Sequence, residues 1–85
     1  MDDLDRDSEV PVYQQIADSI AERIESGELR PRRPIPSEKT LMQAYPGVAR
    51  GTVRRAVEHL RDRGLVYTVP QRGTYVTPPE DRPGD

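Results

Sequence analysis

The sequence predicts a small α+β domain in which three helices are followed by a two-stranded β-hairpin. Apolar residues recur at helical spacing in three separate stretches, and the pattern becomes strand-like only after Gly64. The chain has 85 residues and is 33% hydrophobic, which limits it to one small core. We expect the folded domain to span residues 10–77. The acidic segment 1–9 and the proline-rich segment 78–85 bury too little to be ordered.

The first helix is expected over Val12–Ser26, directly after Pro11, a residue that suits a first helical turn. Gly27 fits the position that follows a helix end. The proline-rich stretch after it predicts an extended connection with Ile35 in the core. One face of the helix is apolar and comprises Tyr13, Ile16, Ala17, Ile20, Ala21 and Ile24.

The next two helices are short and close together in the sequence. Ser37 is a candidate N-cap for a helix over Glu38–Ala44, because its hydroxyl can accept from the amides of the first turn. Pro46 and Gly47 form a turn, and a third helix follows over about Arg50–Arg63. Two helices joined by a tight turn are the outline of a helix-turn-helix. The buried stripe of the third helix is expected to be Val53, Ala56, Val57 and Leu60.

After Gly64, which closes the third helix, the sequence favours strands. Leu65–Pro70 and Thr74–Thr77 are rich in β-branched and aromatic residues, and Pro70–Gly73 between them has turn composition. A hairpin directly after the third helix makes the whole a winged helix-turn-helix, with the hairpin as the wing.

The net charge of −2 hides an uneven distribution. Residues 1–9 hold five acidic residues and one Arg, whereas residues 30–77 hold ten Arg or Lys and three acidic residues. A basic block of this kind indicates a polyanionic partner, although a solvated basic face is the common alternative.

Several function classes are disfavoured by what the sequence lacks. It has no Cys, no His/Cys set at metal-ligand spacing, no glycine-rich phosphate loop and no nucleophile with a base, so we expect neither an enzyme nor a cofactor or metal. No apolar run is long enough to span a bilayer, so we expect no membrane partner and a cytoplasmic location.

Four motifs in order carry a family resemblance: PVYQQIADSIAERIESGELRP, PSEKTL, GVARGTVRRAVEHL and GLV…RGTYV. From Pro11 to about Val76 the chain resembles the DNA-binding domain of GntR-type bacterial transcription regulators, the HutC and YtrA branches above all. The resemblance implies sequence-specific binding to double-stranded DNA, most often as a repressor. It places the third helix in the major groove and the wing tip in or near the minor groove.

Arg50 and Arg54 are the candidate base-reading residues, since they share one helix face and their planar donor forks match guanine O6 and N7. The resemblance and the chemistry of the side chains or backbone add further candidates for DNA contact: Tyr13, Ser37, Lys39, Ala49, Gly51, Thr52, Arg55, Gln71, Arg72, Gly73 and Thr74.

Purely structural roles compete with several of these assignments. Arg54 and Arg55 could form a solvated face with Glu58, Ser37 could be only a cap, and Tyr13 could be core. Three further groups are assigned structural roles first: Arg61 and Arg63 to the helix dipole, Arg30, Arg32 and Arg33 to a solvated loop, and His59 to packing or the surface.

The sequence departs from the family pattern in four ways. Pro46 is an extra residue in the turn, Ala49 stands where Ser is common, and Gln71 stands where the wing tip usually has Gly. Only eight residues follow Thr77, so we expect no effector domain and no small-molecule effector site in this chain. We therefore expect a monomer that pairs as a homodimer on a palindromic operator. The alternatives are a protein-interaction module, or the DNA-binding fragment of a longer effector-responsive regulator.

Overall fold

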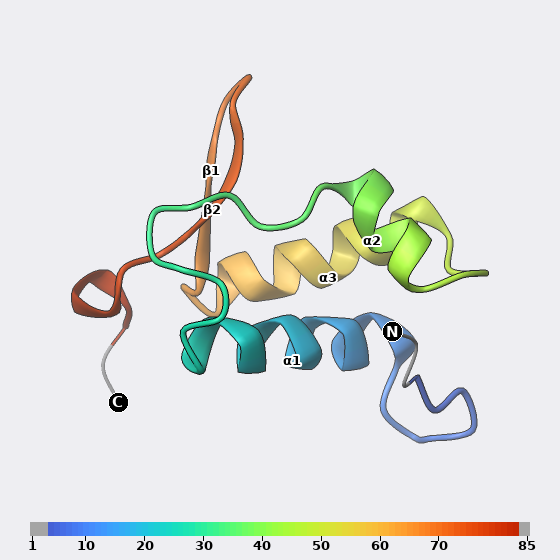
Figure 1. The fold of residues 1–85 in the computed structure, drawn as a ribbon. Helices are drawn as coiled ribbons and strands as arrows, with labels where there is room; N and C mark the ends of the chain where they lie inside the picture. Colours follow the sequence, from blue (N-terminus) through green and yellow to red (C-terminus); the bar gives the residue numbers. More distant parts are fainter. Residues whose placement is uncertain (1–3, 84–85) are drawn as a thin grey trace.

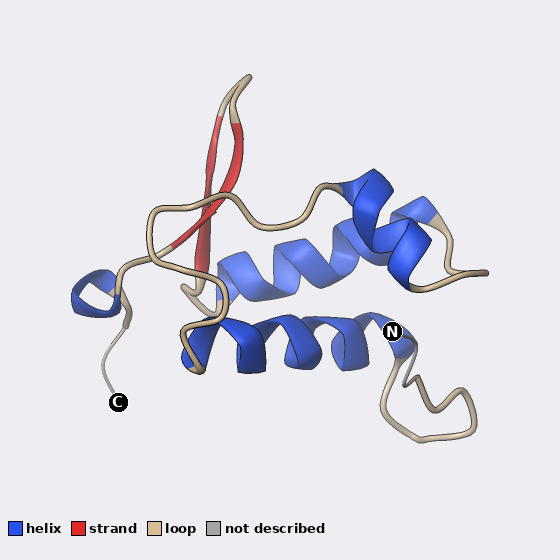
Figure 2. Cartoon of the chain, in the orientation of Figure 1, coloured by secondary structure: helices blue, strands red, loops and turns tan. Residues whose placement is uncertain are grey.

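The computed structural model describes residues 4–83 and contains three helices followed by a hairpin (Figures 1 and 2). This confirms the predicted fold. Helices α1 and α3 end one residue earlier than expected, because Ser26 and Arg63 are their C-caps. The elements in order are α1 (Val12–Glu25), α2 (Glu38–Ala44), α3 (Arg50–Asp62), β1 (Val66–Val69), β2 (Gly73–Val76) and a 3₁₀ turn, η1 (Pro79–Asp81).

The core lies between α1 and α3, with α2 and the base of the hairpin closing it. Figure 1 shows α1 and α3 side by side and the hairpin projecting away from the helices as a wing. Val57, expected in the buried stripe of α3, is only half-buried because it faces a surface hollow beneath the wing. The fully buried large side chains are Ile16, Ile20, Leu41, Val53, Leu60 and Val76.

The ends of the helices follow the sequence signals. The Ser37 hydroxyl accepts a hydrogen bond from the Thr40 amide at 3.1 Å, which confirms the predicted N-cap of α2. Ala49 is the N-cap residue of α3 and provides no side-chain acceptor. Gly27 and Gly64 adopt positive φ angles of 87° and 76° directly after α1 and α3, a conformation that glycine adopts with little strain.

The connection between α1 and α2 runs beside the hairpin as a third extended segment. The Arg32 amide donates to the Val76 carbonyl at 2.8 Å, the Val76 amide to Arg33 at 2.9 Å, and the Ile35 amide to Thr74 at 2.9 Å. Arg32 and Arg33 lie in a turn with exposed side chains, which confirms the prediction of a solvated loop, and the backbone of this loop is hydrogen-bonded to β2. Arg32 turns with a positive φ of 66°, whereas Arg33 and Ile35 each precede a proline, which favours extended backbone suited to pairing with β2. Ile35 is buried as predicted.

The described part of the N-terminal segment contacts α1. Gln15 accepts a hydrogen bond from the Asp5 amide at 2.8 Å and donates to the carbonyls of Asp5 and Val10, both at 2.8 Å. Leu4 packs against the core. Residues 1–3 of the segment expected to be disordered lie outside the described residues, so disorder of segment 1–9 as a whole stays a prediction.

The described residues at the C-terminal end form a compact turn that we call the C-terminal clasp, Thr77–Pro83. The Thr77 amide donates to Leu65 at 3.0 Å, and Arg82 donates through Nε to the Thr77 carbonyl at 3.0 Å. The Pro83 ring occupies the space that a side chain on Gly64 would need. Residues 84–85 lie outside the described residues, and disorder of segment 78–85 as a whole likewise stays a prediction.

Candidate nucleic-acid interface

The two predicted base-reading residues converge on one carboxylate. Arg50 and Arg54 lie in the first half of α3, and their Nε atoms are 3.8 Å and 3.2 Å from the two carboxylate oxygens of Glu38. All three side chains stay accessible, with 62%, 60% and 41% of their surface exposed. Arg54 therefore pairs with Glu38 of α2 and not with Glu58, the partner considered from the sequence.

Glu38 was missed by sequence reasoning. The helix-turn-helix connection places the first turn of α2 beside the first half of α3, and this proximity is not visible in the spacing of residues. One signal was available. Glu38 is the only acidic residue between Arg30 and Val57, and it opens a helix, where an acidic side chain is favourable.

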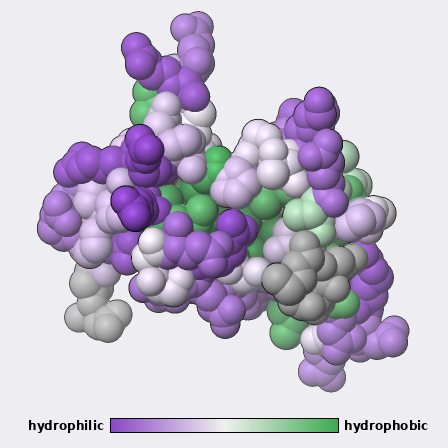
Figure 3. Space-filling view, in the orientation of Figure 1, coloured by the Kyte–Doolittle hydropathy of each residue, from purple (hydrophilic) through white to green (hydrophobic). Residues whose placement is uncertain are grey.

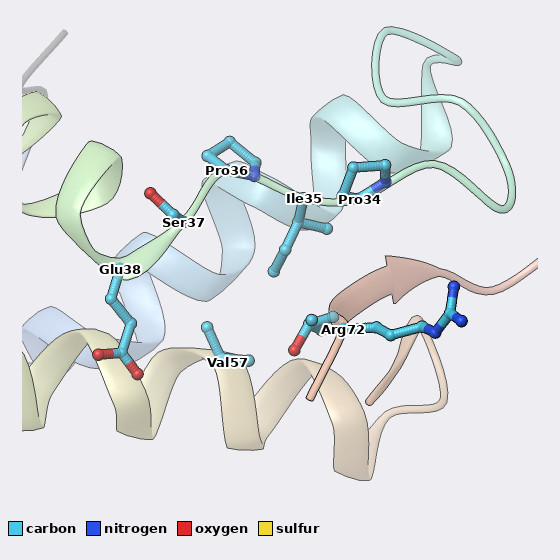
Figure 4. Close-up of a pocket in the computed structure, with 9 residues that line it drawn as sticks. Pro34, Ile35, Pro36, Ser37, Glu38, Val57 and Arg72 are labelled. Atoms are coloured by element: carbon cyan, nitrogen blue, oxygen red, sulfur yellow. The ribbon is translucent and has the colours of Figure 1, made fainter. Parts of the chain in front are cut away.

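A hollow of about 370 Å³ separates the wing from the start of α2, and we call it the wing groove. Figure 3 shows the notch between the hydrophilic wing tip and the α2 end of the molecule. In Figure 4, Glu38 points toward α3, whereas the side chain of Arg72 points away from Glu38. The groove is lined by Pro34, Ile35, Pro36, Ser37, Glu38, Val57, Arg72, Gly73 and Thr74. It thus brings one predicted contact, the N-cap residue Ser37 of α2, together with three on the wing.

A second hollow, of about 410 Å³, lies between the starts of α1 and α3, and we call it the α1–α3 hollow. The guanidinium carbon of Arg55 lies 4.1 Å from the centroid of the Tyr13 ring, and His59 meets the same ring edge-on with centroids 5.8 Å apart. Tyr13 is half-buried and packs against the core, which fits the structural role considered for it, while DNA contact by Tyr13 stays a prediction. The hollow is lined by Val12, Tyr13, Ala49, Gly51, Thr52 and Arg55, five of which are predicted contacts.

The wing tip is built on an unusual backbone. Gln71 adopts a positive φ of 66°, which is uncommon for a residue other than glycine. Glycine would adopt this conformation with less strain than Gln71 does. The Arg72 amide donates to the Val69 carbonyl at 3.0 Å and closes the turn, and the Arg72 side chain is exposed.

Arg61 and Arg63, at the C-terminal end of α3, were expected to interact with the helix dipole. Each of them also has a specific side-chain partner. Arg61 donates to the Thr68 hydroxyl at 2.7 Å, and that hydroxyl lies 3.2 Å from the hydroxyl of Thr74 across the hairpin. Arg63 pairs with Asp18 of α1 at 3.1 Å. These contacts fix the wing and α1 to the C-terminal end of α3.

Eleven of the thirteen predicted contacts therefore fall into three groups along α3: the pair beside Glu38, the wing groove and the α1–α3 hollow. Lys39 is exposed but lines neither hollow, and Gln71 is at the wing tip outside both. Within residues 4–83, no cluster of His, Asp or Glu could hold a metal ion. None of the described helices is both long and apolar enough to cross a membrane.

Known proteins resemble this chain over most of its length. Residues 12–76 match the family model described as bacterial regulatory proteins, gntR family. The chain is 38% identical over 77 residues to the HTH-type transcriptional repressor NagR of Bacillus subtilis, covering 91% of this chain and 31% of NagR. It is 37% identical over 75 residues to the histidine utilization repressor of Klebsiella aerogenes, covering 88% of this chain and 31% of that protein. The chain thus spans less than a third of the length of these curated relatives.

Two solved structures extend the comparison to the fold. The crystal structure of AraR(DBD) in complex with operator ORR3 has a TM-score of 0.76 and 36% identity, covering 91% of this chain and 92% of that one. The GntR-family transcription factor YtrA from Sulfolobus acidocaldarius has a TM-score of 0.77 and 39% identity, covering 87% and 77% of the two chains.

Proposed function

Because this chain belongs to the gntR family of bacterial regulatory proteins, we propose that it binds double-stranded DNA sequence-specifically and regulates transcription as a repressor. The observation that carries the proposal is the position of four exposed arginines, Arg50, Arg54, Arg55 and Arg72, on the first half of α3 and the wing tip. The curated relatives are named as repressors, and AraR(DBD) is seen on an operator.

The geometry of B-DNA suggests how the three groups act together. With α3 in the major groove, Arg50 and Arg54 reach base edges, where each guanidinium can bond guanine O6 and N7. Arg72 and Gln71 then lie at the adjacent minor groove, whose negative potential attracts arginine. The sugar–phosphate ridge between the two grooves passes over the wing groove, where the Thr74 hydroxyl can donate to a phosphate oxygen. The Ser37 hydroxyl donates to the Thr40 hydroxyl at 3.0 Å and would have to rotate away from it to reach a phosphate.

The α1–α3 hollow faces the sugar–phosphate backbone on the other side of the major groove. Arg55 offers a cation at its rim, and Thr52 offers a hydroxyl and an amide near the start of α3. These phosphate contacts set the position of α3 without reading sequence. The protein acts by binding rather than by catalysis, and its place of action is the bacterial cytoplasm, where the chromosome lies.

Selection of binding sites from random duplex DNA tests this function. We expect an enriched palindromic site with guanines at the positions that α3 reads, bound at least about a thousandfold more tightly than scrambled duplex. Failure to enrich any sequence, combined with binding of acidic proteins, would replace this proposal with a protein-interaction module.

We further propose that two copies pair on the operator. One domain of this size reads only a few base pairs, and symmetric half-sites are the usual way to extend the site. Light scattering is expected to give a monomer, and titration of a full operator is expected to give tighter binding of the second copy than of the first. Equal affinity per site on half and full operators would contradict this pairing.

A further inference from the structure

Glu38 lies where a DNA-binding surface would be expected to exclude an acidic side chain. It lines the wing groove, it is 41% exposed, and it meets both base-reading candidates. Among residues 4–83, Glu38 is the acidic side chain recorded in ion pairs with the first half of α3. A carboxylate here repels phosphate, so it weakens the charge-driven part of DNA binding. Its contacts with Arg50 and Arg54 indicate a compensating contribution to sequence discrimination.

The atoms that Glu38 engages are informative. Its Oε2 accepts a hydrogen bond from Arg54 Nε at 3.2 Å, and its Oε1 lies 3.8 Å from Arg50 Nε. Glu38 thus meets both arginines at Nε. The two terminal amino groups of each guanidinium remain available, and these can form the paired bonds to guanine O6 and N7.

We propose that Glu38 is the positioning residue for base reading: it hydrogen-bonds Arg54 at Nε, attracts Arg50 at Nε by charge, and directs their terminal amino groups to guanine rather than to phosphate. The proposal rests on the function proposed above and adds a determinant of specificity to it. An arginine without such a partner is free to rotate toward the nearest phosphate, which carries no sequence information. Glu38 therefore lowers affinity for all DNA and raises discrimination between sequences.

The test compares Glu38→Gln with Glu58→Gln, a matched removal of one negative charge from an exposed residue of α3. Dissociation constants are measured on the selected site and on scrambled duplex for both variants and the wild-type chain. The base preferences of Arg50→Ala and Arg54→Ala are mapped in parallel. Circular dichroism melting checks that each variant is folded.

We expect Glu38→Gln to bind scrambled duplex more tightly than wild type and to lose about tenfold in the ratio of specific to non-specific affinity. The lost preference should fall on the base pairs that Arg50→Ala and Arg54→Ala relax. Glu58→Gln should tighten both complexes alike and keep the ratio within about twofold, because it changes charge without releasing either arginine.

Three results would overturn the positioning role: an unchanged ratio for Glu38→Gln, an equal loss for Glu58→Gln, or a lost preference at other base pairs. The last result would indicate that Glu38 contacts a base itself. A wild-type chain that fails to discriminate between duplexes is a different outcome, because it overturns the proposed function and this inference with it.

Discussion

Arg55 of α3 lies over the aromatic ring of Tyr13 of α1, with its guanidinium carbon 4.1 Å from the ring centroid. The arrangement is a cation–π contact, which stabilises exposed pairs by about 0.5–1 kcal/mol. It restricts a long, mobile side chain to the rim of the α1–α3 hollow. A cation held there is suited to one phosphate of the DNA backbone.

We therefore expect Arg55→Ala to weaken binding to specific and scrambled duplex by the same factor. The plot of log affinity against log salt should become shallower by about one unit, as for the loss of one phosphate contact. Fluorescence anisotropy titrations at several salt concentrations measure both quantities. Arg30→Ala, an exposed arginine outside both hollows, is the control and should leave the slope unchanged. A change in base preference would contradict the assignment of Arg55 to phosphate.

Arg50→Ala and Arg54→Ala should behave differently from Arg55→Ala. Each is expected to cost about 1–3 kcal/mol on the selected site and to relax preference at one base pair, because a bidentate contact to guanine is lost. Gel-shift competition against single-base variants of the site measures the effect. Retention of wild-type preference by both variants would show that a different face of α3 reads the bases.

Arg72→Ala tests the wing. The side chain is exposed and stands at a turn, so its removal should leave the melting temperature unchanged. We expect either a shallower salt dependence, by about one unit, or an altered preference for A·T-rich flanks if the guanidinium enters the minor groove. Binding assays with flank-substituted duplexes separate these two outcomes. A variant that matches wild type in both assays removes Arg72 from the interface.

Substitutions at the two N-cap residues of the helix-turn-helix, Ser37 and Ala49, should change stability in opposite directions. Ser37→Ala should lower the free energy of unfolding by about 1 kcal/mol, because the Thr40 amide loses its acceptor. Ala49→Ser should raise it by up to about 1 kcal/mol, since Ala49 has the extended N-cap backbone (φ −72°, ψ 153°) but no acceptor. Urea unfolding followed by circular dichroism tests both changes. Destabilisation by Ala49→Ser would contradict the capping assignment of that position.

Because the C-terminal clasp packs against Gly64, we expect Gly64→Ala to destabilise the protein more than Gly27→Ala does. Gly27→Ala and Gly64→Ala both place a side chain at positive φ, which costs on the order of 1 kcal/mol. Only at Gly64 would the new methyl group also overlap the Pro83 ring, whereas Gly27 faces open space. Gly64→Ala should therefore be the more destabilising variant and should expose the clasp to proteases. Equal destabilisation would show that the clasp contributes nothing to stability.

The sequence predicted what depends on local spacing. The helical stripe containing Ile16 and Ile20, the Ser37 cap and the hairpin after Gly64 are each encoded within a few residues, and the structure confirms all three. Arg50 and Arg54 could be placed side by side because residues four apart share a helix face, and their base reading stays a prediction.

Contacts between distant segments were the part that could not be predicted. Glu38 meets Arg54 only because α2 crosses the start of α3, and the Pro83 ring meets Gly64 only because the chain turns back after β2. The pairing of Pro34 with Tyr75 of β2 was also not predicted. Proline within a run of residues argues against a strand, so its position gave no signal for this pairing.

The pairing of Arg32–Ile35 with β2 also affects how copies of the protein behave when crowded. Exposed strands can recruit a strand from another molecule through free amide donors. Here the amides of Arg32 and Ile35 are bonded to β2, that of Arg33 donates to Arg30 at 3.2 Å, and Pro34 has none. The outer side of this segment thus has no amide with which to begin intermolecular β-sheet, so this side of the wing is protected against edge-to-edge aggregation.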